Sequence, residues 1–103
     1  MATEQDIAQG VMVIAAGQPN GVASFNRCRI EIPNLVQLNA ANLAPSGPRN
    51  GEPMWHQIVR NIKSHDIAGT NYIAQGLLEH VSRVGYRITA GGRAHLQALG
   101  IHP

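Results

Sequence analysis

The sequence predicts an α+β fold, mainly helical with a small antiparallel β-hairpin, in a single domain over residues 1–103. Apolar residues recur at helical spacing in several segments, which indicates helices that each bury one face. Two short β-like runs near the C-terminus flank a turn, which is the pattern of a hairpin. No repeat, low-complexity tract or linker divides the chain, and 103 residues suffice for one modest core.

Side chains that can accept a hydrogen bond from a helix N-terminus mark where the first helices begin. Thr3 precedes acidic residues and an apolar stripe, so a first helix is predicted to begin there and to end in the breakers of residues 17–21. A short strand can precede Ser24, which starts a second helix, and Pro33 is predicted to stop that helix. Asn39 can cap a further helical turn.

The segment 52–65 reads as an amphipathic helix, and Pro53 is tolerated in its first turn. Trp55, Ile58 and Ile62 recur at i, i+3 and i+7, so they are predicted to face the core. The opposite face is polar and carries His56, Gln57, Arg60 and Lys63.

The last quarter of the chain predicts a hairpin followed by a helix. Residues 77–81 and 86–88 have the composition of strands and flank a short turn that carries Arg83. Thr89 can cap a last helix, in which Leu96 and Leu99 are predicted to pack inward.

The order helix, short strand, helix, helix, strand, strand, helix is typical of a winged helix-turn-helix. We therefore expect three to four helices and a two- or three-stranded antiparallel wing. In such a fold the helix at 52–65 would read the major groove of DNA, and the hairpin at 77–88 would contact the flanking backbone.

Positive charge gathers in the second half of the chain. Residues 1–48 carry two cations and three acids, whereas residues 49–103 carry six cations and three acids. This asymmetry favours an anionic partner such as nucleic acid, although a net charge of +2 is modest for a dedicated DNA binder.

The sequence offers no pattern typical of a metal site, a cofactor site or an active site. No two of the five histidines are four residues apart, and a single cysteine excludes the common cysteine-rich zinc sites. Ser64, His65 and Asp66 are adjacent, so on a helix they point about 100° apart and cannot form a catalytic triad. We therefore expect no metal, no cofactor and no enzymatic activity.

The composition also bears on the compartment. Cys28 is the only cysteine, which fits a buried thiol in a reducing cytoplasm. No apolar run approaches the roughly 20 residues that span a bilayer, and the acidic start lacks the cationic region of a secretory signal. A cytoplasmic protein without a membrane partner is therefore expected.

Two segments carry a family resemblance. Residues 55–65 read WHQIVRNIKSH, and residues 86–93 read YRITAGGR. Over residues 52–99 the chain resembles the N-terminal winged-helix domain of Mrr-type restriction endonucleases, which also occurs in small free-standing bacterial proteins. The resemblance implies a DNA-binding role with the helix at 52–65 as the reader, and it carries over no nuclease domain.

These observations lead to the hypothesis of a non-enzymatic protein that binds duplex DNA. Glutamine suits adenine and arginine suits guanine, so Gln57 and Arg60 are expected at base edges. His56 is a further donor facing the groove. The cations expected to contact phosphates are Arg49, Lys63, Arg83 and Arg87.

Two alternatives stay open at this point. The same scaffold can serve as a protein-interaction module or adaptor, because a fold does not dictate its function. A homodimer is also compatible with the sequence, because many winged-helix proteins read palindromic half-sites.

Overall fold

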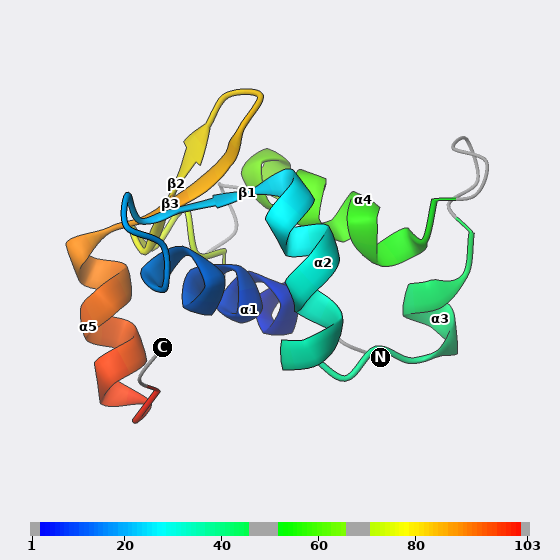
Figure 1. The fold of residues 1–103 in the computed structure, drawn as a ribbon, viewed down its shortest axis with the longest axis horizontal. Coiled ribbons are helices and arrows are strands. Elements are labelled where there is room, and N and C mark those ends of the chain that lie inside the picture. The colour runs from blue at the N-terminus through cyan, green and yellow to red at the C-terminus, as the bar shows by residue number, and fades with distance from the viewer. Residues whose placement is uncertain (1–2, 46–51, 66–70, 102–103) are drawn as a thin grey trace.

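A computed structural model describes residues 3–45, 52–65 and 71–101. Within these residues the protein is an α+β structure of five α-helices, one 3₁₀ helix and one three-stranded sheet (Figure 1). No helix in the described part is long and apolar enough to cross a membrane. The elements in chain order are α1 (Glu4–Ala16), β1 (Val22–Ser24), α2 (Phe25–Leu35), α3 (Ala40–Leu43), α4 (Met54–Asn61), the 3₁₀ helix η1 (Ile62–His65), β2 (Leu78–Val81), β3 (Gly85–Ile88) and α5 (Ala90–Ala98).

The sheet has the order β1-β3-β2, with both pairs antiparallel. Ala23 of β1 and His80 of β2 both pair with Tyr86 of the central strand β3. Helix α1 packs against β1 and β3, and α2 and α4 pack in turn against α1 (Figure 1). This arrangement gives the predicted winged-helix order, with β2 and β3 as the wing.

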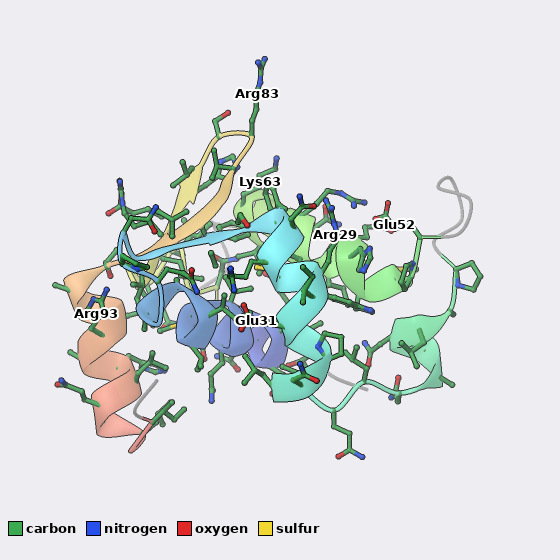
Figure 2. All side chains as sticks on the ribbon, in the orientation of Figure 1. Arg29, Glu31, Glu52, Lys63, Arg83 and Arg93 are labelled. Atoms are coloured by element: carbon green, nitrogen blue, oxygen red, sulfur yellow. The ribbon has the colours of Figure 1, made fainter. Side chains whose placement is uncertain are left out.

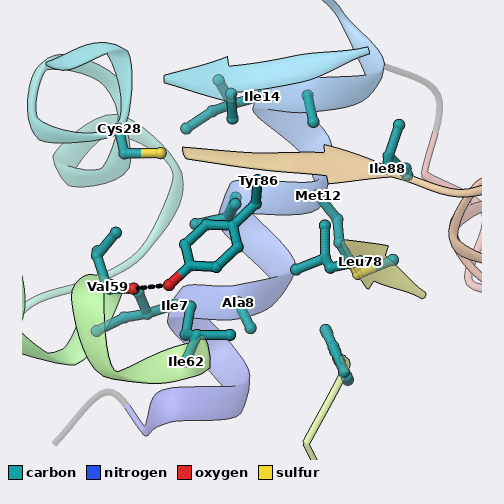
Figure 3. Close-up of a cluster of buried hydrophobic side chains, with 14 of the residues drawn as sticks. Ile7, Ala8, Met12, Ile14, Cys28, Val59, Ile62, Leu78, Tyr86 and Ile88 are labelled. Carbon is teal, nitrogen blue, oxygen red and sulfur yellow. Dashed lines mark hydrogen bonds between the residues drawn. The ribbon is translucent and has the colours of Figure 1, made fainter. Parts of the chain in front are cut away.

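Helix α1 supplies the centre of the core (Figure 3). Its apolar side chains lie beneath the buried residues of the sheet and of α4, and Tyr86 reaches between them. The fully buried members with the largest side chains include Tyr86, Ile7, Met12, Ile32, Ile62, Leu78 and Leu96.

Four of the five predicted helix starts are confirmed, whereas the helix predicted over 52–65 begins later, at Met54, and changes to 3₁₀ geometry at Ile62. Thr3 accepts a hydrogen bond from the Asp6 N–H at 3.1 Å, in a capping box. Ser24, Asn39 and Thr89 accept equivalent bonds at the starts of α2, α3 and α5. Each of these bonds joins residues three apart, so local sequence was sufficient to predict them.

The prediction that Pro33 stops the second helix is wrong, because α2 continues to Leu35. Pro33 lies on the exposed side of α2, and it costs the helix the one hydrogen bond that an N–H at this position would donate to the carbonyl four residues earlier. The buried Ile32 holds this last turn on the core, and its carbonyl accepts the Val36 N–H at 2.9 Å.

The predicted apolar face of the third helix is wrong at one position. Trp55 and Ile62 are buried, but Val59 takes the place between them, whereas Ile58 is only partly buried against the core. The buried stripe therefore has the spacing i, i+4 and i+7, which is equally compatible with an α-helix.

Leu99 does not pack inward as predicted, because its side chain is 52% exposed. The chain turns at Gly100, which has a φ of 75°, and the Ile101 N–H donates to the Leu96 carbonyl at 2.9 Å. This is a Schellman motif, in which the residue after the glycine packs back on the last helical turn. Ile101 therefore takes the inward place that was predicted for Leu99.

The connection between α2 and α4 is much longer than the three or four residues of a simple helix-turn-helix. It contains α3, which packs against α4. The Met54 N–H donates to the Ala44 carbonyl at 2.8 Å, and Pro45 forms an isolated β-bridge with Pro53. These contacts fix the start of α4 in place of a short turn.

Cys28 lies in the core, where burial and the charge of Glu31 raise its pKa to about 12. A thiol needs its thiolate form to react, so the native thiolate fraction at neutral pH should be far lower than that of the unfolded chain. We expect iodoacetamide to alkylate the protein in urea and to leave the native protein unmodified, as read by mass spectrometry. Rapid alkylation under native conditions would contradict this placement of Cys28.

Candidate nucleic-acid interface

The side chain of Tyr86 holds the end of α4 against the central strand. Its O–H donates to the Val59 carbonyl at 2.6 Å, and its oxygen accepts the Lys63 N–H at 3.3 Å (Figure 3). The ring is fully buried and meets Phe25 of α2 edge-on, with ring centroids 5.6 Å apart. Burial raises the pKa of Tyr86 above its usual range, so it stays a neutral donor.

The side chain of Asn71 holds the 3₁₀ helix η1, which follows α4 in the chain. Its Nδ2 donates to the Ile62 carbonyl at 2.8 Å and to the Glu4 carboxylate at 3.0 Å. Its Oδ1 accepts the N–H groups of Ile73 and Ala74. The buried amide thus joins the start of α1, η1 and the turn before β2, and it fixes the segment that carries Lys63.

His56 lies half-buried on α4, with its ring 4.2 Å from that of Trp55. Burial lowers its pKa, and the nearby positive charges of Arg29 and Arg60 act in the same direction against the opposing effect of Glu52. At neutral pH this histidine is therefore an uncharged donor or acceptor rather than a cation.

Arg60 forms an ion pair with Glu52, which lies eight residues earlier at the approach to α4. The exposed fractions of the two side chains are 26% and 18%, so the pair is largely covered. Arg60 can contact a base only after leaving this carboxylate. The neighbouring Gln57 lies half-buried on the same helix.

The wing carries one paired and one unpaired arginine. Arg87 donates to the Glu79 carboxylate of the adjacent strand at 2.8 Å, in an exposed pair that leaves little net charge. Arg83 lies at the tip, where it is exposed and has no ion-pair partner in the described part of the chain (Figure 2).

Lys63 is exposed and lies near the wing. Burial lowers the pKa of His80 on β2, and the positive charge of Lys63 acts in the same direction. No acidic side chain among the described residues pairs with Lys63. Arg49, the remaining predicted phosphate contact, lies outside the described residues.

The structure adds Arg29, which the sequence analysis did not select. It lies exposed on α2, and its only polar contact within the described residues is a hydrogen bond of 2.6 Å from Nη1 to the Asn26 side chain. The neighbouring Arg27 pairs with Glu31 one turn later, at 2.8 Å. The signal was available in the sequence, because no acid lies three or four residues from Arg29.

Among the residues that the structure describes, the cations Arg29 on α2, Lys63 on η1, Arg83 on the wing and Arg93 on α5 have no acidic partner, and the first three come from three different elements near the wing. Figure 2 shows these three on the side of the molecule that carries the wing, whereas Arg93 lies on α5 at the other end.

Within the described residues, no group of three His, Cys, Asp or Glu side chains could hold a metal ion. No family model, curated protein or solved structure matches this chain.

Proposed function

We propose that this protein binds duplex DNA without catalysing a reaction on it, through α2, α4, η1 and the wing. The observation that carries the proposal is the set of cations Arg29, Lys63 and Arg83, which have no acidic partner among the described residues and are spread along one side of the molecule (Figure 2). Duplex DNA presents a dense row of negative charges, and separated cations of this kind suit phosphates along its backbone.

The ion pairs strengthen this reading because they cancel the other charges. Arg27, Arg60 and Arg87 are each neutralised by a carboxylate. The surplus positive charge on this side of the described structure is therefore limited to the unpaired cations, which we assign to phosphate contacts. Gln57 on α4 is the side chain proposed for base edges, and Arg60 would join it after exchanging Glu52 for a guanine.

On the resemblance of residues 55–65 and 86–93 to Mrr-type winged-helix domains, we propose further that the chain is a restriction-related DNA-binding module of bacterial type. A reducing cytoplasm is the proposed compartment, because the lone thiol of Cys28 is buried and unpaired.

The direct test is a charge-removal variant that carries Arg29→Gln, Lys63→Gln and Arg83→Gln. Each lost phosphate contact should reduce the slope of log affinity against log salt by about 0.9, so the triple variant should lose close to three units of slope. Fluorescence anisotropy of a labelled mixed-sequence duplex between about 50 and 200 mM salt measures this slope.

The matched control removes cations that the structure pairs or places elsewhere, with Arg27→Gln and Arg93→Gln. It should keep the salt dependence of the unmodified protein. Equal losses in the two variants, or binding that does not respond to salt, would falsify the proposal.

A protein-interaction module is the second candidate, and exposed apolar side chains favour it. Ile30 and Leu35 on α2 and Leu43 on α3 are 72%, 48% and 56% exposed. A partner protein that binds there should be lost on Ile30→Ser, whereas DNA binding should not change. Loss of DNA binding in that variant would show that the exposed apolar side of α2 contributes to the DNA contact together with Arg29.

A further inference from the structure

An open pocket of about 350 Å³ lies between the start of α2 and the tip of the wing. Its volume falls at the lower end of the range for small-ligand sites. It combines apolar and cationic walls from two segments that are distant in sequence. The residues that line it are Ser24, Phe25, Asn26, Arg29, Arg83 and Val84.

The apolar wall consists of Phe25 and Val84. Phe25 is held from behind by its edge-on contact with Tyr86, and its N–H donates to the Val84 carbonyl at 2.8 Å. This bond ties the start of α2 to the wing, so the wall is fixed. Val84 is 44% exposed, so its side chain is accessible to a ligand in the pocket.

The cationic side consists of Arg29 and Arg83. The hydrogen bond to Asn26 holds the Arg29 guanidinium and leaves most of its five N–H donors for another partner. The Arg83 side chain extends from the rim of the pocket into solvent (Figure 2). Exposed side chains change rotamer within nanoseconds, so Arg83 can turn back over the pocket.

The backbone at Arg83 is strained. Its φ of 65° makes it the one non-glycine residue of the described structure with a positive φ. It is the third residue of a β-turn closed by the Val84 N–H and the Val81 carbonyl at 3.0 Å. Glycine or asparagine is favoured at such a position, and strain of this kind clusters at functional sites. Arginine is not among the residues that such a position favours.

We propose that this pocket binds a nucleoside monophosphate unit. The phosphate would lie between the guanidinium groups of Arg29 and Arg83, which suit its oxygen atoms. The sugar and base would lie against Phe25 and Val84. The unit has two sources, a free nucleotide or the phosphorylated end of a DNA strand, and it is a ligand additional to the interior of the duplex.

The test is an amide NMR titration of the full chain with dAMP, deoxyadenosine and inorganic phosphate. dAMP should shift the amide signals of Ser24, Phe25 and Val84, and each half-ligand should bind at least about tenfold more weakly. Arg29→Gln should weaken dAMP by a similar factor, and Arg93→Gln should leave it unchanged. Absence of shifts, shifts centred on Lys63, or equal binding of phosphate and dAMP would overturn the proposal.

A second variant separates ligand binding from folding. Arg83→Asn removes the charge and relieves the backbone, so the Tm should stay the same or rise by up to about 5 °C while dAMP affinity falls. A lower Tm with unchanged dAMP affinity would show that Arg83 serves the turn alone.

DNA substrates then identify the source of the nucleotide and test the two proposals independently. Tighter binding of a 5′-phosphorylated duplex than of its 5′-hydroxyl form assigns the pocket to strand ends, and equal binding with dAMP still bound assigns it to free nucleotide. Closed circular DNA has no ends. If the protein binds dAMP but not the circle, the proposal of duplex binding is wrong and the pocket proposal stands. If it binds the circle but not dAMP, the pocket proposal is wrong and duplex binding stands.

Discussion

Replacing Gly85 by alanine is expected to prevent stable folding. A Cβ at Gly85 would lie 1.9 Å from the Ala23 carbonyl oxygen and 2.9 Å from the Ser24 Cα, both of which are backbone atoms of β1. No side-chain movement can relieve this clash, so β1 must separate from β3. The loss should exceed about 4 kcal/mol, a large share of the roughly 5–15 kcal/mol by which small domains are stable.

Gly91→Ala is the matched control. A Cβ there would lie 3.4 Å from the Gly76 carbonyl oxygen, which is an ordinary contact, on an exposed position of α5. Alanine is the better helix former, so this variant should gain about 0.5–1 kcal/mol. Thermal unfolding followed by circular dichroism compares the two variants. A Gly85→Ala protein that melts within a few degrees of the unmodified chain would contradict the close approach of β1 and β3.

Tyr86→Ala is expected to produce the second largest loss, about 3–5 kcal/mol, because it empties a fully buried aromatic site at the centre of the core. Tyr86→Phe keeps the ring and removes only the hydroxyl. It should cost about 1–3 kcal/mol, because the Val59 carbonyl loses a buried donor and the Lys63 N–H loses its acceptor.

Urea unfolding measures both losses, and amide hydrogen exchange at Lys63 reports the tether itself. In Tyr86→Phe this amide should exchange faster, while amides of β2 keep their protection. If Tyr86→Phe is as stable as the unmodified protein, the hydroxyl does not hold α4 to β3.

The sequence predicted the parts of the fold that depend on neighbours in the chain. The starts of α1, α2, α3 and α5 depend on side-chain oxygens three residues from their donors, and β2 and β3 depend on two short runs around a tight turn. Pro33 misled the prediction because a proline removes only one helical hydrogen bond, and the sequence does not show that the neighbouring Ile32 is buried in the core. Ile58 was preferred over Val59 because both spacings suit a helix, and only the packing against α1 chooses between them.

The candidate site was predicted less well, because pairing of charges is a tertiary property. Nothing near Arg60 on its own helix indicates that Glu52 neutralises it, since the pair spans the start of α4. Arg29 gained its significance only when α2 and the wing tip were found to line one pocket. The polar side chains predicted for α4 are half-buried in the structure, and the surplus positive charge lies on the elements around this helix.

The single hydroxyl of Tyr86 also has a mechanical consequence. It forms hydrogen bonds with the Val59 carbonyl of α4 and the Lys63 N–H of η1, whereas the backbone of Tyr86 belongs to the wing strand β3. The position of α4 relative to the wing is therefore fixed by one side chain. A ligand bound to α4 also restricts where the wing can reach. The changes in binding free energy that substitutions in α4 and in the wing cause should therefore be coupled and not additive.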